Sequence, residues 1–185
     1  DDTVIVADPG TPTPYLGAQY QLGRRGRRTI FARGGGGLAF AIRAVAGAAN
    51  GGRVAPGGDS TADGSFGMSC GGLETITRLN LPIVFIHANN SSFGWIKELQ
   101  HLYHDDNYFS VDFDPVDYAG IARGFGFQAT QVTEPEQVKP ALAKALADGR
   151  PWFIDVVTES QITETPPVAG WISAEAKRKQ GSLVR

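Results

Sequence analysis

The chain has 185 residues and a formal net charge of −2. Hydrophobic residues make up 42% of it and charged residues 19%, which is too apolar for a disordered chain and enough for a core. The near-zero net charge disfavours a protein held on nucleic acid by phosphate contacts. No run approaches the ~20 apolar residues that a membrane helix needs. We therefore expect one compact domain that binds neither nucleic acid nor a membrane.

The cellular setting follows from the cysteine count and the N-terminus. The single cysteine, Cys70, cannot form an internal disulfide, so we expect a reducing compartment and a cytoplasmic location. No N-terminal stretch has the pattern of a signal peptide. The sequence begins with Asp1 rather than Met, from which we expect a fragment, a processed product or a small subunit.

Strand-like and helix-like patterns alternate along the chain. Short β-branched or aromatic runs, bounded by Gly, Pro or polar residues, predict strands at 3–7, 29–32, 83–86, 127–132 and 152–157. The 83–86 run is apolar on both faces, which is typical of a central parallel strand. Helical spacing predicts helices at about 15–25, 38–49 and 68–79.

Two later helices have recognisable start signals. Asp114 is the expected N-cap of one, with Pro115 at its first position. Residues 133–136 match a capping box for the other, in which Pro140 should kink or delay the helix. Beyond Ser160 the chain is polar and is expected to wrap the surface or a partner.

The alternation of strands and helices predicts an α/β fold with three layers, in which a mainly parallel sheet has helices on both faces. We place one domain at 1–170 and a C-terminal tail at 171–185. Ligands of such folds lie beyond the carboxyl ends of the strands, here in the loops after Ala7, Ala32 and Ala88. The chain has 24 glycines, clustered within 34–37, 51–58 and 64–72, which favours a ligand bound by backbone groups.

Two dipeptides that are far apart in the sequence contain the candidate metal-binding residues. Asp63-Gly64 precedes a predicted helix, and Asn89-Asn90 follows the 83–86 strand, with 24 residues between Gly64 and Asn89. One helix and one strand fill that separation, so the chain returns beside its start. A carboxylate and an amide oxygen suit Mg²⁺ or Ca²⁺, and the backbone N–H groups of Gly64 and Ser65 suit an anion. These residues predict a metal-bridged diphosphate site.

This arrangement resembles the motif of thiamine diphosphate-dependent enzymes, which is written GDG, about 25 residues and NN. Residues 8–13, 36–48, 65–68, 73–75 and 81–84 are also similar to this family, most of all to its acetolactate synthase-like branch. The resemblance covers about residues 1–170. It implies the thiamine diphosphate-binding fold, thiamine diphosphate and Mg²⁺ as cofactors, and a lyase or transferase. The expected activity is that of a 2-oxoacid decarboxylase or carboligase, which breaks or forms a C–C bond next to a carbonyl.

The resemblance implies ligands for the metal and the diphosphate. Asp63 and Asn90 would bind Mg²⁺ through their side chains, and Ser92 would bind it through its carbonyl oxygen. Gly64 and Ser65 would hold the diphosphate through their backbone N–H groups.

The resemblance also implies contacts with the rest of the cofactor. Thr11 and Thr13 would lie over the diphosphate. The Gly36 carbonyl would accept the amino group of the aminopyrimidine. Leu38 would be the bulky side chain wedged under the bent cofactor.

The chain departs from the family pattern at three places. Ala62 replaces the first glycine of GDG, and Arg43 stands where proline is usual. The family runs an apolar strand into GDG, whereas residues 51–58 have a composition that disfavours a strand.

The resemblance implies that this chain is part of a larger active unit. In the family, a glutamate on a separate pyrimidine-binding domain of the partner subunit activates the cofactor, and none of these 185 residues resembles that domain. We therefore expect the catalytic glutamate on a second subunit, a homodimer or homotetramer, and a small 2-oxoacid or acyl-CoA substrate.

Four other interpretations stay open at this point. The enzyme could be a 2-hydroxyacyl-CoA lyase or resemble oxalyl-CoA decarboxylase. The pattern Gly34-x-Gly36-x-x-Ala39 mimics a dinucleotide fingerprint, which would indicate an NAD-binding Rossmann domain. The changes from the family pattern could also mark a degenerate, non-catalytic assembly domain. Finally, His101 and His104 beside two aspartates could form a metal cluster, although a solvated polar segment is the simpler interpretation.

Overall fold

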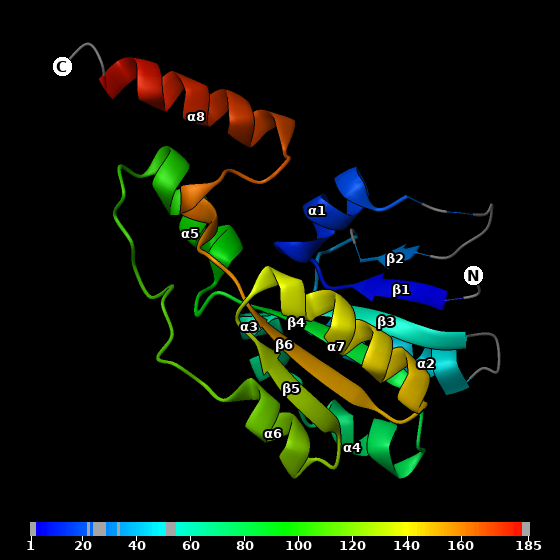
Figure 1. The fold of residues 1–185 in the computed structure, drawn as a ribbon. Coiled ribbons are helices and arrows are strands. Elements are labelled where there is room, and N and C mark those ends of the chain that lie inside the picture. The colour runs from blue at the N-terminus through cyan, green and yellow to red at the C-terminus, as the bar shows by residue number, and fades with distance from the viewer. Residues whose placement is uncertain (1–2, 22, 24–28, 33, 51–54, 183–185) are drawn as a thin grey trace.

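The computed structural model describes residues 3–21, 23, 29–32, 34–50 and 55–182, with the backbone only for 55–61, 63, 181 and 182. Six strands form one sheet in the order β2-β1-β3-β4-β6-β5, and every neighbouring pair is parallel (Figure 1). The strands are β1 (Thr3–Ala7), β2 (Thr29–Phe31), β3 (Ala55–Ala62), β4 (Ile83–Asn89), β5 (Gln128–Val132) and β6 (Trp152–Val157). The expected parallel sheet is confirmed.

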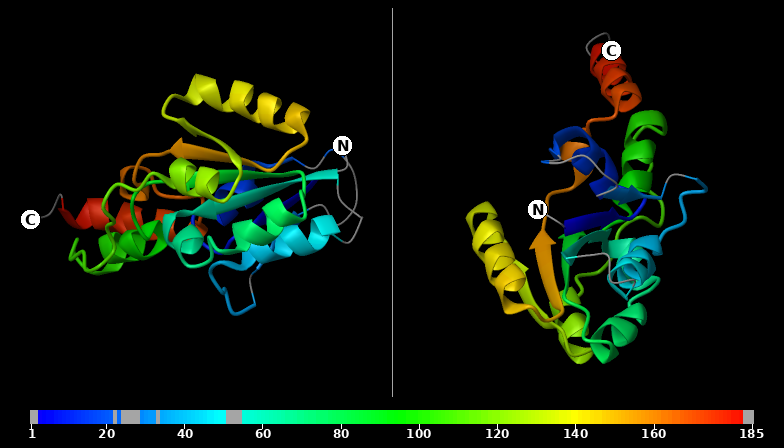
Figure 2. Two further views of the ribbon diagram at one scale, coloured as in Figure 1. Left: turned by 90° about the horizontal axis from the view of Figure 1, so that it is seen from below. Right: turned by 90° about the vertical axis from the view of Figure 1, so that its right-hand side faces the viewer.

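Helices cover both faces of this sheet, so the expected three layers are confirmed. The helices are α1 (Pro12–Gln19), α2 (Phe40–Asn50), α3 (Asp63–Gly67), α4 (Gly72–Arg78), α5 (Gly94–Tyr103), α6 (Tyr118–Gly124), α7 (Pro135–Asp148) and α8 (Ala169–Ser182). Figure 2 shows α7 on one face and α2 and α4 on the other.

Alternating side chains of the central strands supply both cores. Ile83 and Phe85 of β4 belong to a large cluster with α2, α3, α4 and α6, while Val84 belongs to a smaller cluster under α7. Because successive strand residues point to opposite faces, the apolar run of β4 serves both layers at once. This explains why β4 was the easiest strand to predict.

The strand that leads to the site departs from expectation. Residues 55–62 form β3 in the middle of the sheet, although their composition disfavours a strand; residues 51–54 lie outside the described part. The register with β1 shifts between Thr3 and Ile5, and pairing with β4 begins only at Gly57. Pro56 therefore lies at an irregularity before the regular ladder, where its missing N–H matters least.

Several helix boundaries also differ from expectation. Asp117, not Asp114, caps α6, because its Oδ1 accepts the Gly120 N–H at 2.6 Å. The capping box of α7 uses Glu134 and Gln137, one residue later than expected, and the helix runs without delay through Pro140. The helix expected at about 15–25 is α1, which begins earlier because prolines occupy its start; residues 22, 24 and 25 lie outside the described part.

The C-terminal stretch forms a short 3-10 helix, η1 (Gln161–Thr163), and then helix α8, which lies at the periphery beside α5 (Figure 1). The Trp171 ring packs edge-on against the Trp95 ring of α5, with centroids 4.3 Å apart. The boundary expected between 170 and 171 falls inside α8.

Candidate cofactor-binding site

The backbone brings the two predicted metal-binding segments to the same edge of the sheet. Ala62 at the end of β3 is the register partner of Ala88 in β4. Asp63 follows Ala62 directly as the first residue of α3, and Asn90 follows the end of β4. Because the strands are parallel, both segments lie beyond the carboxyl ends of neighbouring strands, where ligands of this architecture bind. The side chain of Asp63 lies outside the described part, so its role as a metal ligand stays a prediction.

A cavity of about 350 Å³ opens at this edge. Loops that follow four different strands contribute its walls. Six of the nine predicted site residues line it, namely Thr11, Gly36, Leu38, Gly64, Ser65 and Ser92. Residues that sequence reasoning did not assign to the cofactor line it too, among them Asp8 and the start of α5 from Phe93 to Ile96.

Thr13 lies elsewhere. Its side chain is buried, and its hydroxyl donates to the Asp8 carbonyl at 2.6 Å. It lines neither this cavity nor the larger one described below, and it holds the loop after β1. Its expected contact with the diphosphate stays a prediction.

Asp8 joins three of the segments that surround the cavity. Its Oδ1 accepts the Ala41 N–H at 2.9 Å, and its Oδ2 accepts the Ser65 hydroxyl. The Ser65 oxygen in turn accepts the Ala39 N–H at 2.9 Å. Asp8 is only 1% exposed, and burial raises the pKa of its carboxyl, although these donors partly oppose that rise. The sequence signal was limited to an acidic residue directly after an apolar strand.

The segment between β2 and α2 has an unusual backbone. Gly35 and Gly36 have φ values of +79° and +56°, which glycine adopts without strain. Ala39 has a φ of +67°, a left-handed conformation that costs an L-residue about 1–2 kcal/mol. Leu38 stands between them, 40% exposed at the cavity, so the distorted backbone presents an apolar side chain to the ligand space.

A glycine is required at the start of α3. A Cβ on Gly64 would collide with the Phe93 ring, which itself packs edge-on against Phe113 with centroids 4.6 Å apart. The close approach leaves the Gly64 backbone at the cavity wall without a side chain in the way. This supports the expected use of backbone groups at this position.

Asn90 forms a local turn with Ser92. Its Oδ1 lies 3.2 Å from the Ser92 N and 3.1 Å from the Ser92 Oγ, and both groups donate to it. These hydrogen bonds order the loop after β4 without help from a ligand. Whether Asn90 and the Ser92 carbonyl also bind a metal stays a prediction.

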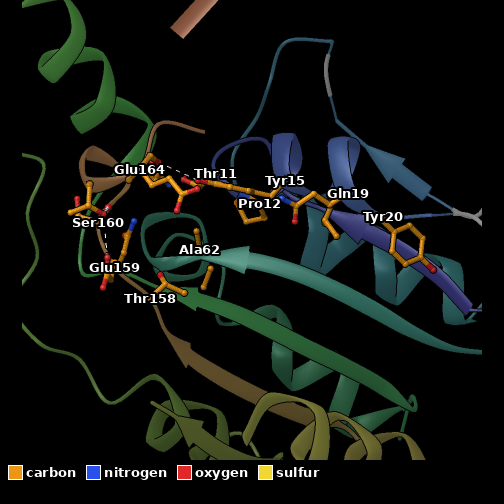
Figure 3. A pocket seen from close by; sticks show the side chains of 15 residues that line it. Thr11, Pro12, Tyr15, Gln19, Tyr20, Ala62, Thr158, Glu159, Ser160 and Glu164 are labelled. Atoms are coloured by element: carbon orange, nitrogen blue, oxygen red, sulfur yellow. Dashed lines mark hydrogen bonds between the residues drawn. The ribbon is translucent and has the colours of Figure 1, made fainter. Parts of the chain in front are cut away.

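A second cavity, of about 540 Å³, adjoins the first and shares Thr11, Pro12 and Ala62 with it (Figure 3). The α1 residues Pro12, Tyr15 and Gln19 line one wall, and the segment after β6 lines the other. Asn90 and Thr11 also line it, so it adjoins the predicted metal-binding loop.

Gln161 is a buried polar residue beside this second cavity. It is 6% exposed, and neither its Oε1 nor its Nε2 has a hydrogen-bond partner among the described residues. Both amide atoms lie within 2.8 Å of where a Cβ on Gly94 would be, as does the Asn90 Nδ2. A buried amide without partners is costly, so it fits a site that a hydrated metal or another polar group completes. The residues present thus fit a metal and diphosphate group at this edge.

The histidine segment does not form a metal cluster. His101 Nδ1 lies 2.6 Å from Asp106 Oδ1, and His101 Nε2 lies 3.4 Å from Glu175 Oε2 in α8, while Arg178 pairs with Asp106. Among the described residues, no group of three His, Cys, Asp or Glu could hold a metal ion. The segment ties α8 to α5. Over the same part of the chain, no helix is both long and apolar enough to cross a bilayer.

A family model described as "Thiamine pyrophosphate enzyme, C-terminal TPP binding domain" matches residues 9–156. The chain belongs to this family. The match includes every predicted site residue, and it favours the thiamine interpretation of residues 34–39 over the dinucleotide one. The expected family and cofactor are therefore confirmed: this is a thiamine pyrophosphate-binding domain of the kind found in acetolactate synthase-like enzymes.

Curated relatives and solved structures agree with this assignment. The probable acetolactate synthase large subunit of Methanocaldococcus jannaschii is 26% identical over 160 residues, which are 85% of this chain and 27% of that protein. The acetolactate synthase isozyme 2 large subunit of Escherichia coli is 28% identical over 160 residues, 84% of this chain and 28% of that protein. The crystal structure of benzoylformate decarboxylase from Polynucleobacter necessarius has the same fold, with a TM-score of 0.79 at 21% identity, over 86% of this chain and 30% of that one. The chain thus spans less than a third of each of these proteins.

Proposed function

We propose that this thiamine pyrophosphate-binding domain works in a Mg²⁺-dependent 2-oxoacid decarboxylase or carboligase of the acetolactate synthase type. The observation that carries the proposal is the cavity at the carboxyl ends of the strands. It gathers Thr11, Gly36, Leu38, Gly64 and Ser65 from segments that follow β1, β2 and β3. Chain segments that follow three different strands would contact a ligand held there.

The residues divide between the two ends of the cofactor. Gly64 and Ser65 are proposed to donate their backbone N–H groups to the diphosphate, beside a Mg²⁺ ion held by Asp63, Asn90 and the Ser92 carbonyl. These ligands are hard oxygen atoms, which Mg²⁺ prefers, and Mg²⁺ completes its shell with phosphate and water.

At the other end of the cofactor, residues of this chain are proposed to contact its ring system. Gly36 is proposed to accept a hydrogen bond from the aminopyrimidine through its carbonyl, and Leu38 to support the ring system from below. When bound, the cofactor supplies an electron sink for breaking or forming a C–C bond next to a carbonyl. The task of this chain's residues is to bind, orient and shield it.

The reaction is proposed to need a second subunit. Leu38, Phe40 and Ile96 are 40%, 36% and 47% exposed, and Leu38 and Ile96 line the cavity. Exposed apolar side chains around a binding site are typical of a surface that a partner covers. We propose that a pyrimidine-binding domain of a second subunit covers it in a homodimer or homotetramer and supplies the catalytic glutamate. The single cysteine supports a cytoplasmic location.

Calorimetric titration tests the proposal on the purified protein in the assembly that it forms. Thiamine diphosphate is expected to bind in the presence of Mg²⁺ and to bind much more weakly after chelation with EDTA, whereas NAD should not bind under either condition. Binding of NAD without thiamine diphosphate would contradict the proposal. Binding of neither would favour a non-catalytic assembly domain.

A further inference from the structure

Asp8 is the one charged side chain among the described residues that line the 350 Å³ cavity. A carboxylate in the wall of a site for a diphosphate calls for an explanation, because like charges repel. Its burial excludes a solvated surface role, since only 1% of the residue is exposed. None of the roles assigned above uses it.

The hydrogen bonds of Asp8 connect two chain segments that line the cavity. One carboxylate oxygen accepts the Ala41 N–H in the first turn of α2, next to the segment that presents Gly36 and Leu38. The other oxygen accepts the hydroxyl of Ser65 in α3. The Ala39 N–H closes the loop by donating to that same hydroxyl oxygen at 2.9 Å. Hydrogen bonds to a charged acceptor are stronger than neutral ones, so this small network holds the start of α2 and α3 firmly to the loop after β1.

We propose that Asp8 is a positioning residue for the cofactor, which fixes the spacing between the wall that carries Gly36 and Leu38 and the wall that carries Gly64 and Ser65. The inference rests on the proposed function, because it assigns the two walls to the two ends of thiamine diphosphate. Asp8 acts through Ser65 and the start of α2 rather than through contact with the ligand.

The same bonds define what Ser65 can offer. Its hydroxyl proton is donated to Asp8, and its oxygen accepts from Ala39. The hydroxyl therefore has no proton left for a phosphate oxygen, and only the backbone N–H of Ser65 remains as a donor. The Asp8 network turns Ser65 into a backbone ligand.

Two ligands of different length test this role. Inorganic pyrophosphate with Mg²⁺ needs only the Gly64 and Ser65 wall, whereas thiamine diphosphate spans both. Asp8→Ala removes both acceptors and should weaken thiamine diphosphate roughly tenfold while changing pyrophosphate affinity less than about twofold. Asp8→Asn keeps an acceptor for the Ala41 N–H and should give an intermediate loss of roughly threefold. It also serves as the second variant if Asp8→Ala does not fold.

The control is another buried carboxylate away from the cavity. Asp155 is fully buried, and it accepts from Asn89 Nδ2 at 3.2 Å and Gln131 Nε2 at 2.9 Å. Asp155→Asn should lower the melting temperature without changing the ratio of the affinities for thiamine diphosphate and pyrophosphate. Equal losses of both ligands in the Asp8 variants, or no loss of thiamine diphosphate, would overturn the inference. A wild-type protein that fails to bind thiamine diphosphate would instead overturn the proposed function itself.

Discussion

Ala62 of β3 and Ala88 of β4 are register partners at the carboxyl edge of the sheet. The next residue after Ala62 is Asp63, and Asn90 comes two residues after Ala88. Two residues that are far apart in the chain thus begin their loops from neighbouring strand ends. The parallel ladder, rather than any contact made locally, sets their relative position.

Asp63→Asn should remove most of the dependence of thiamine diphosphate binding on Mg²⁺. A direct metal ligand should matter at least as much as an outer hydrogen-bond partner, whose loss typically costs about 10–100-fold in metal affinity. Calorimetric titration at several Mg²⁺ concentrations measures the effect. Asp112→Asn is the control, because the Asp112 side chain is 60% exposed and pairs with Lys97. Unchanged Mg²⁺ dependence in Asp63→Asn would remove Asp63 from the metal site.

Gly64→Ala should destabilise the fold by about 1–3 kcal/mol, because the new methyl group collides with the Phe93 ring. Urea denaturation measures the free energy of unfolding. Gly67→Ala in the same short helix is the matched control, since a Cβ there meets nothing within 4 Å. Adding Phe93→Leu to Gly64→Ala should restore part of the lost stability. Equal stability of the two alanine variants would show that the ring does not require glycine.

Ala39→Gly should stabilise the protein by about 1 kcal/mol, because it relieves the left-handed conformation of an alanine. Glycine also gives the unfolded chain more conformational entropy to lose on folding. This cost reduces the gain in stability but is smaller than it. Ala48→Gly, inside α2, should instead lower the free energy of unfolding by about 1 kcal/mol. Opposite signs for the two substitutions support the strained backbone, and a loss of stability in both would argue against it.

Glu98→Gln should change how stability depends on pH. Glu98 of α5 is fully buried, and burial, with a smaller contribution from Glu175, raises its pKa above 4.5, while His101 and Arg178 oppose the rise. A carboxyl with a raised pKa binds its proton more tightly in the folded state, so its stabilising contribution is lost as the pH rises through that pKa. The variant should therefore gain stability over the wild type as the pH rises above about 4.5. Parallel stability curves would contradict the assignment.

Trp171→Ala should release α8 from α5 while leaving the sheet folded. Trp171 is 7% exposed and packs on Trp95, which lines the cavity. Amide hydrogen exchange should become faster throughout α8 and remain slow in β4 and β6. Ile172→Ala, at a position that is 53% exposed, should leave exchange unchanged. Faster exchange in β4 and β6 as well would show that α8 belongs to the cooperative core.

The sequence predicted best those elements whose signal is local. The bounds of β1 and β6 agree with the expected runs, because each is a compact apolar segment. β3 was missed because its pairing partners, not its own residues, make it a strand. Asp8 was missed for a related reason: its importance arises from Ala41 and Ser65, 33 and 57 residues away. Backbone roles such as that of Gly64 could be expected from the motif, whereas hydrogen-bond partners required the folded chain.

The composition of β3 has a consequence for how the protein responds to its ligand. The strand crosses the middle of the sheet between β1 and β4 without any Val, Ile, Leu or aromatic residue. It therefore contributes little hydrophobic stability to the centre of the sheet. A ligand bound at the carboxyl ends of both β3 and β4 would hold these two strands together. Ligand occupancy and the integrity of the sheet would then be coupled, and resistance to proteolysis should rise with saturation.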